Sequence, residues 1–101
     1  IQTVEEPSMI ISTTNINKEY EIINTVFVIH GEEASGIFGT GGIDTDKGFD
    51  TVKGLLSAKA SELGADAIIG CDFEQRISSS GGMSDKQVLE IFAFGTAVKF
   101  T

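Results

Sequence analysis

The fold is decided by residues 61–70, SELGADAIIG, in which a helix is expected to end and a buried strand to begin. Gly64 follows a run whose apolar residues recur at helical spacing, so it is the residue expected just past the helix end. Glycine takes the left-handed conformation found there without the steric penalty of a Cβ atom. The segment Ala67–Cys71 then offers apolar residues to both faces, which is typical of a strand covered from both sides. The stretch therefore predicts a helix followed by a strand on which it packs.

The helix before this junction is expected to begin near Asp44 or Asp46, since either carboxylate can cap the free N–H groups of a first turn. Apolar residues spaced by three and four then form one face of the helix. They are Phe49, Val52, Leu56, Ala60 and Leu63. Gly54 interrupts this helix at a cost of about 1 kcal/mol relative to alanine, which predicts a close packing contact at that position.

Strands are expected before and after the helix, in segments rich in β-branched and aromatic residues. They are residues 9–13, 21–30, 67–77 and 86–100, and the connecting loops include the glycine-rich residues 31–47 and residues 78–85. This order predicts an α+β fold, ββαββ, with an antiparallel sheet and one main helix packed on one face. A chain of 101 residues makes one domain, expected over residues 9–101 after a leader at residues 1–8.

The last strand carries apolar residues on both of its faces. One set comprises Val88, Phe92, Phe94, Val98 and Phe100, and the other comprises Leu89, Ile91, Ala93 and Ala97. A single helix covers only one face of a sheet, so the other face needs a partner. The pattern therefore predicts a homo-oligomer, which we expect to be a closed ring.

Composition narrows the choice of partners and location. The net charge is −8, with 15 acidic against 7 basic residues, which disfavours binding to nucleic acid and to anionic membranes. No apolar segment is long enough to cross a bilayer. The single cysteine, Cys71, cannot form an internal disulfide and suits a reducing compartment, so a cytoplasmic location is expected.

Four residues are candidate metal ligands: Cys71, His30, Glu32 and Glu33. A Cys71 thiolate would suit a soft metal, although a small buried hydrophobe is the favoured interpretation in so apolar a strand. His30 at a strand end, with Glu32 and Glu33 after it, could bind a divalent cation with help from another subunit. The favoured interpretation is nevertheless a strand-end histidine beside a solvated acidic turn.

Three other sequence patterns are better explained as structural features than as catalytic or ligand-binding sites. Asp72 and Glu74 share a strand face with Arg76, which favours a surface charge ladder over a catalytic carboxylate pair. The glycines of residues 36–42 lack the Lys-Ser/Thr pair that a phosphate-binding loop requires. Catalysis by a Ser, Thr or Cys nucleophile needs an adjacent base. His30 is the one imidazole that could serve, and nothing in the sequence places it beside such a nucleophile. We therefore expect a binding or structural module and no enzyme.

Three segments together resemble the YbjQ-like family of small bacterial and archaeal proteins, which is labelled as heavy-metal-binding. They are Ser12-Thr13-Thr14, residues 63–70 (LGADAIIG) and residues 94–99 (FGTAVK). The resemblance implies a dodecin-like subunit and a ring-shaped homopentamer. The cofactor is left unknown, although the family's label would fit a soft divalent metal. The chain departs from the family before the helix, where residues 36–47 replace a longer, partly helical arm.

The dodecin-like subunit also suggests an alternative function. A carrier of a flavin-type small molecule would hold its planar ligand between aromatic side chains at a subunit interface. Phe92, Phe94 and Phe100 are the candidates for such stacking, although aromatic residues at alternate strand positions more often belong to a core.

Overall fold

The computed structural model describes residues 9–34, 41–79 and 87–101. Its elements are β1 (Ile10–Ile11), β2 (Tyr20–Glu33), α1 (Thr45–Glu62), β3 (Ala67–Ser79) and β4 (Gln87–Phe100). The leader predicted at residues 1–8, most of the glycine-rich residues 36–42 and most of the loop at 78–85 lie outside the described residues.

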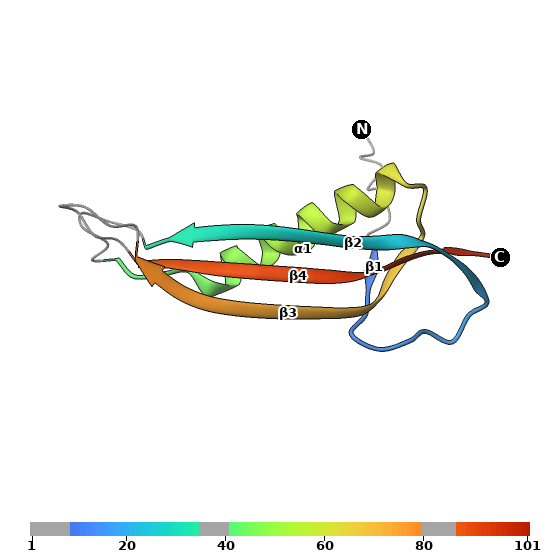
Figure 1. Ribbon diagram of the computed structural model, residues 1–101, viewed down its shortest axis with the longest axis horizontal. Coiled ribbons are helices and arrows are strands. Elements are labelled where there is room, and N and C mark those ends of the chain that lie inside the picture. The colour runs from blue at the N-terminus through green and yellow to red at the C-terminus, as the bar shows by residue number, and fades with distance from the viewer. Residues whose placement is uncertain (1–8, 35–40, 80–86) are drawn as a thin grey trace, which may run out of the picture.

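The strands form one four-stranded sheet in the order β1-β3-β4-β2, and α1 crosses behind it in Figure 1. β4 runs antiparallel to both β3 and β2. β1 pairs in parallel with the start of β3, where Ile10 faces Ala67 and Ile11 faces Ile68. The α+β class and the ββαββ order are confirmed, but the sheet is mixed because the chain crosses the end of the sheet after β1 and enters β2 at the opposite edge.

α1 begins and ends where the sequence predicts. The Asp44 side chain accepts a hydrogen bond of 3.1 Å from the Lys47 backbone N–H and caps the first turn. Past the last turn, Gly64 has a φ of 77° and its N–H donates to the Ser61 carbonyl at 3.0 Å. This is the left-handed conformation that favours glycine, so the junction at residues 61–70 forms as expected.

The prediction of a close contact at Gly54 is wrong. Gly54 is exposed, and a Cβ atom added there would meet no atom within 4 Å. The close approach is made instead by Gly48, where an added Cβ would lie 3.1 Å from Ile91 Cδ1 and 3.3 Å from Glu32 Cβ. Gly48 is buried, which brings the first turn of α1 down onto the sheet.

β2 is longer than the sequence indicates. The predicted strand stops at His30, whereas β2 continues through Glu33 by pairing Gly31 with Glu90 and Glu33 with Val88. The register with β4 compensates for the weak strand preference of glycine. As a consequence, His30 lies inside a strand and not at its end.

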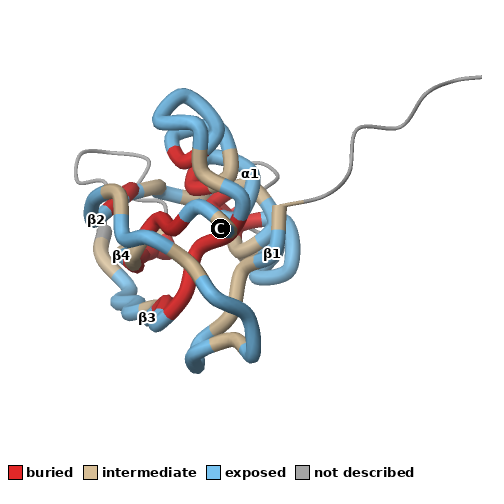
Figure 2. Tube along the Cα trace, turned by 90° about the vertical axis from the view of Figure 1, so that its right-hand side faces the viewer, coloured by how far each residue is buried: buried red, intermediate tan, exposed pale blue. Residues whose placement is uncertain are grey.

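The main core lies between α1 and the face of the sheet that α1 covers. Its buried members are Val26, Val28, Val52, Leu56, Ala60, Ile68, Cys71, Leu89, Ile91, Ala93 and Ala97. A smaller cluster lies on the other face, where Ile16 and Tyr20 pack over Ala67, Ile69 and Val98 at one end of the sheet. The buried segments therefore run along the centre of the molecule, while much of the outer surface of the strands is exposed (Figure 2).

The rest of that second face, which we call the open face, carries exposed apolar side chains. The exposed fractions are 70% for Ile22, 61% for Phe27, 60% for Ile29 and 47% for Phe94. One helix therefore covers one face and leaves the other uncovered within the subunit, as the two apolar sets of β4 predict.

Candidate functional site

His30 and Glu32 are the predicted ligands that the structure brings together. They are two residues apart in β2, so both side chains point toward α1. His30 Nε2 lies 3.1 Å from Glu32 Oε1, and their side chains are 24% and 11% exposed. The second carboxylate oxygen, Oε2, lies 3.6 Å from Lys47 Nζ. The pair is thus held in place and remains partly open to solvent.

Gly48 shapes this pair from the helix side. A Cβ atom at Gly48 would lie 3.3 Å from Glu32 Cβ, a tight fit, so the absence of a side chain lets the first turn of α1 lie close to the carboxylate-bearing residue. Gly48, Val52, Leu56 and Ala60 are spaced by four along α1, and all are buried. That spacing is the signal in the sequence that could have identified Gly48 as a packing position.

The other two predicted ligands lie elsewhere. Glu33 follows Glu32 in the strand and points to the opposite face, where it is exposed. Cys71 lies in the core on β3 and is only 3% exposed. Burial raises the pKa of the Cys71 thiol, and the negative charge of Asp72 raises it further. Both effects favour the protonated thiol, which is a poor metal ligand.

No complete metal site forms from these residues. In the part of the chain that the structure describes, no three His, Cys, Asp or Glu residues gather in a way that could hold a metal ion. His30 and Glu32 supply two ligands, whereas zinc sites usually have three or four protein ligands. One subunit therefore offers at most part of a site.

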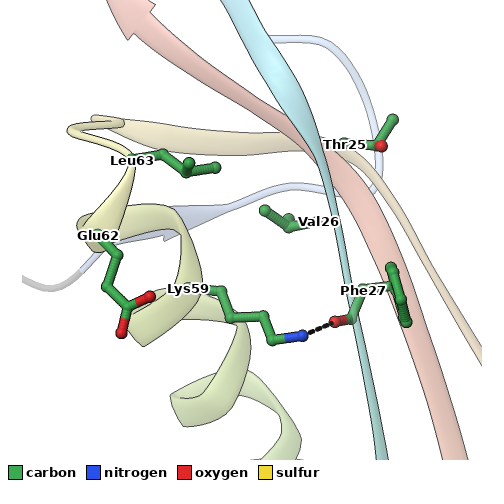
Figure 3. A pocket seen from close by; sticks show the side chains of 6 residues that line it. All are labelled: Thr25, Val26, Phe27, Lys59, Glu62 and Leu63. Atoms are coloured by element: carbon green, nitrogen blue, oxygen red, sulfur yellow. Dashed lines mark hydrogen bonds between the residues drawn. The ribbon is translucent and has the colours of Figure 1, made fainter.

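A groove runs between α1 and β2, whose outer side has no neighbouring strand among the described residues. It consists of two adjoining hollows that share Lys59 and Glu62. One, of about 220 Å³, is also lined by Thr25, Val26, Phe27 and Leu63 (Figure 3). The other, of about 360 Å³, is also lined by Val28, Ile29, Leu55 and Ala58.

Lys59 crosses this groove to the strand. Its Nζ donates a hydrogen bond of 2.8 Å to the backbone carbonyl of Phe27 and lies 4.8 Å from the centre of the Phe27 ring. In Figure 3 the side chain of Lys59 extends toward β2, and that of Glu62 points away from it. The groove therefore presents a positive charge at the edge of β2.

The open face becomes charged toward β3. Asp72, Glu74 and Arg76 are all exposed, as a surface charge ladder requires. Arg76 Nε donates to Glu90 Oε2 at 2.7 Å, and Ser78 Oγ donates to Glu90 Oε1 at 2.9 Å. These hydrogen bonds, that from Arg76 first, lower the pKa of the Glu90 carboxyl.

The three aromatic residues considered for ligand stacking differ in their surroundings. Arg76 lies over the Phe92 ring at 5.5 Å, and Lys18 lies over the Phe100 ring at 4.4 Å. Phe94 lies opposite Phe27 of β2 and remains 47% exposed. Phe27 and Phe94 are therefore the aromatic pair that the open face presents.

Across residues 9–34, 41–79 and 87–101, the structure contains no helix with the length and apolar character needed to cross a membrane.

Comparison with known proteins gives a family match over the C-terminal part of the chain. The model of the YbjQ family, described as "Putative heavy-metal-binding", matches residues 47–101, more than half of the chain. These residues include nearly all of α1, the junction at 61–70, β3 and β4. No curated protein matches the chain.

A solved structure extends the similarity to most of the chain. It belongs to a protein of unknown function from Pediococcus pentosaceus, of the DUF74 family. The two are 25% identical with a TM-score of 0.75, and the match covers 94% of this chain and 100% of the other. The shared fold therefore includes part of the N-terminal segment that lies outside the family match.

Proposed function

The chain belongs to the YbjQ family, whose description concerns heavy metals, and we propose that it is a self-associating metal-binding module. In this proposal His30 and Glu32 supply two ligands to a divalent cation. The observation that carries it is the 3.1 Å contact between His30 Nε2 and Glu32 Oε1, in side chains that are 24% and 11% exposed.

The chemistry of this pair favours a borderline cation such as Zn²⁺ over a soft one. Imidazole nitrogen and carboxylate oxygen are both zinc ligands, whereas soft metals prefer thiolates. Cys71 fits a soft-metal site poorly, because its thiol is buried and its pKa is raised. A cation at His30 and Glu32 would take the place of the Lys47 ammonium beside the carboxylate.

The remaining ligands are proposed to come from a second copy of the chain or from water. Self-association is supported by the exposed apolar residues of the open face, of which Ile22, Phe27 and Ile29 are at least 60% exposed. The state that we propose is the homopentamer, which rests on the resemblance to the family. Light scattering at low micromolar concentration tests it, and a stable monomer would contradict the proposal.

Metal binding is tested on untagged protein by equilibrium dialysis against Zn²⁺ with elemental analysis. We expect stoichiometric Zn²⁺ in the wild type, in Cys71→Ala and in the matched control Glu33→Gln. We expect at least a tenfold loss of affinity in His30→Ala and in Glu32→Gln, because each removes a ligand. Retention of full affinity in His30→Ala, or its loss in Cys71→Ala, would contradict the assignment of the ligands.

A second candidate function is a carrier of a planar, flavin-type molecule. The observation that favours it is the exposed pair of Phe27 and Phe94, which face each other across β2 and β4. The proposal is supported if added flavin shows quenched fluorescence or shifted absorbance with the wild type and neither change with Phe94→Ser. Absence of flavin binding at millimolar ligand would reject it. For both candidates we propose binding and not catalysis.

A further inference from the structure

The exposed apolar side chains are not spread evenly over the open face. Of the eight large apolar residues that are exposed in the described part of the chain, five lie on the two sides of the free edge of β2, with Ile22, Phe27 and Ile29 on the open face and Leu55 and Leu63 on the helix side. The opposite side of the open face, along β3, is charged instead. A partner that covers the apolar residues must therefore wrap the edge of β2, because stacking on the open face alone would leave Leu55 and Leu63 exposed.

The backbone of β2 faces outward along this edge, where the Lys59 side chain occupies one of its carbonyls. The Phe27 carbonyl accepts its hydrogen bond from Lys59 and not from β4, so it points outward. In an antiparallel pair, residues whose backbone N–H and C=O groups bond to the neighbouring strand alternate with residues whose backbone groups point away from it. The backbone N–H and C=O groups of Ile29 therefore point outward, as those of Phe27 do. An unpaired strand edge beside an apolar groove is suited to a further strand.

The opposite edge of the same sheet offers such a strand. β1 pairs only with the beginning of β3, so β3 from Asp72 onward has no strand on its outer side among the described residues. This part of β3 carries Ile77, which is 57% exposed and belongs to the face that α1 covers. A strand added to β2 in parallel, with the same face toward the helices and with Asp72 and Glu74 beside Phe27 and Ile29, would place Ile77 beside the last residues of β2, beyond the groove.

Charge distinguishes this contact from a symmetric one between two β2 edges. A symmetric contact centred on Phe27 would bring two copies of Lys59 together at the strand edge, which is unfavourable. The β3 edge instead carries the exposed carboxylates of Asp72 and Glu74, and among the described residues Glu74 has no ion-pair partner. These carboxylates complement the Lys59 ammonium at the β2 edge.

We propose that the free edge of β2 in one copy binds the free edge of β3, residues 72–79, in the next copy. This inference rests on the self-association proposed above and specifies its contact. β2 and β3 both run antiparallel to β4, so this head-to-tail repetition joins them as parallel strands. A contact between two different surfaces closes into a ring when the rotation between copies allows it.

The test uses two variants that each block one edge. Ile29→Glu places a carboxylate in the β2 edge opposite Asp72 and Glu74 of the next copy, and Ile77→Glu blocks the β3 edge. Both positions are more than half exposed, at 60% and 57%, so each variant should fold. Ser61→Glu, on the exposed side of α1, adds the same charge away from both edges and serves as the control.

We expect each edge variant alone to dissociate at least ten times more readily than the wild type in size-exclusion chromatography with light scattering. An equimolar mixture of the two should form a 1:1 heterodimer, because one intact β2 edge and one intact β3 edge remain. If Ile29→Glu dissociates and Ile77→Glu does not, the contact is a symmetric one between two β2 edges, and the inference is overturned. An oligomer unaffected by either variant would also overturn it, while self-association itself would stand. A monomeric wild type would instead contradict the proposed self-association, and this inference with it.

A charge exchange provides a second test that does not depend on Ile29 or Ile77. Lys59→Glu and Glu74→Lys should each weaken association, and the chain carrying both substitutions should recover at least part of it. No recovery in the double variant, with each chain folded by circular dichroism, would overturn the assignment of Lys59 and Glu74 to opposite sides of one contact.

Discussion

The two faces of the sheet are built from the same strands and from similar residues, yet they have different environments. In β4, Leu89 and Ile91 on the covered face are 3% and 0% exposed, whereas Phe94 on the open face is 47% exposed. The difference arises from α1, which covers only one side. Burial of apolar area contributes about 25 cal/mol per Å², so the covered face stabilises the single chain, whereas the open face would contribute to stability only where a partner covers it.

The largest change in the free energy of unfolding is expected from truncating a core side chain on the buried side of α1. Leu56 is fully buried at 0% exposed, so Leu56→Ala leaves a cavity and should lower the free energy of unfolding by about 2–5 kcal/mol. Its neighbour Leu55 is 42% exposed and lines the groove. Leu55→Ala should lower the free energy of unfolding by less than about 1 kcal/mol.

Urea denaturation of both variants measures this difference between adjacent leucines. Equal midpoints for Leu56→Ala and Leu55→Ala, with unchanged m-values, would contradict the assignment of Leu56 to the core and of Leu55 to the exposed groove.

A smaller effect is expected from overpacking the covered face. An added Cβ at Gly95 would lie 2.6 Å from Ile68 Cγ2 and 3.3 Å from Cys71 Cα, so β3 or β4 must move. Gly95→Ala should therefore destabilise the subunit by about 1–3 kcal/mol. Gly54→Ala is the matched control, because it adds the same methyl group to open space in a helix and should stabilise by up to about 1 kcal/mol.

Thermal unfolding of the two glycine variants should thus shift in opposite directions. A stabilising Gly95→Ala would show that the contact between β3 and β4 is looser than these distances indicate.

Local signals in the sequence predict the parts of the fold that depend on neighbouring residues. Asp44 and Gly64 mark the ends of α1 through capping and a left-handed turn. The immediate surroundings identify Gly64, and they restrict the N-cap to Asp44 or Asp46. The two faces of β4 follow from simple alternation. The parallel pairing of β1 and the extension of β2 to Glu33 depend on residues distant in sequence, so no local pattern specifies them. The spacing by four along α1 indicates that Gly48 is buried, but its close approach to Ile91 and Glu32 again depends on distant residues.

The same limit applies to the candidate site. The separation of His30 and Glu32 by two residues predicts that they share a face, and by the same rule Glu33 faces the other way. The burial predicted for Cys71 is confirmed, but the face on which it lies was less predictable because β3 changes register between Ile69 and Asp72, where Gly70 has a φ of 57°. Such a bulge changes which face each later residue occupies.

The Cys71 thiol gives a more subtle test of the covered face. Because its pKa is raised in the folded state, the unfolded chain loses this proton first as the pH rises. The contribution to stability is therefore complete below the ordinary thiol pKa of 9.0 and is lost as the pH rises above it. We expect the denaturation midpoint of the wild type to fall between pH 8 and 10 by more than that of Cys71→Ala.

Thiol labelling checks the same burial at neutral pH. Native protein should react slowly with a maleimide and urea-unfolded protein rapidly. Rapid stoichiometric labelling of the native form would contradict the core position of Cys71 and return it to the candidate ligands.

The smallest effect on subunit stability is expected at the centre of the open face. Phe94→Ser removes a ring that is 47% exposed, so the free energy of unfolding of the dissociated subunit should change by about 0.5 kcal/mol or less. Association should respond more strongly, because Phe94 faces Phe27 beside the β2 edge. For a protein that associates, the midpoint rises with protein concentration, since mass action favours the folded oligomer. We expect this dependence to be weaker in Phe94→Ser than in the wild type, with both curves converging at the lowest concentrations. A midpoint that is lower by the same amount at every concentration would instead assign Phe94 to the stability of the subunit and remove the contrast between the two faces.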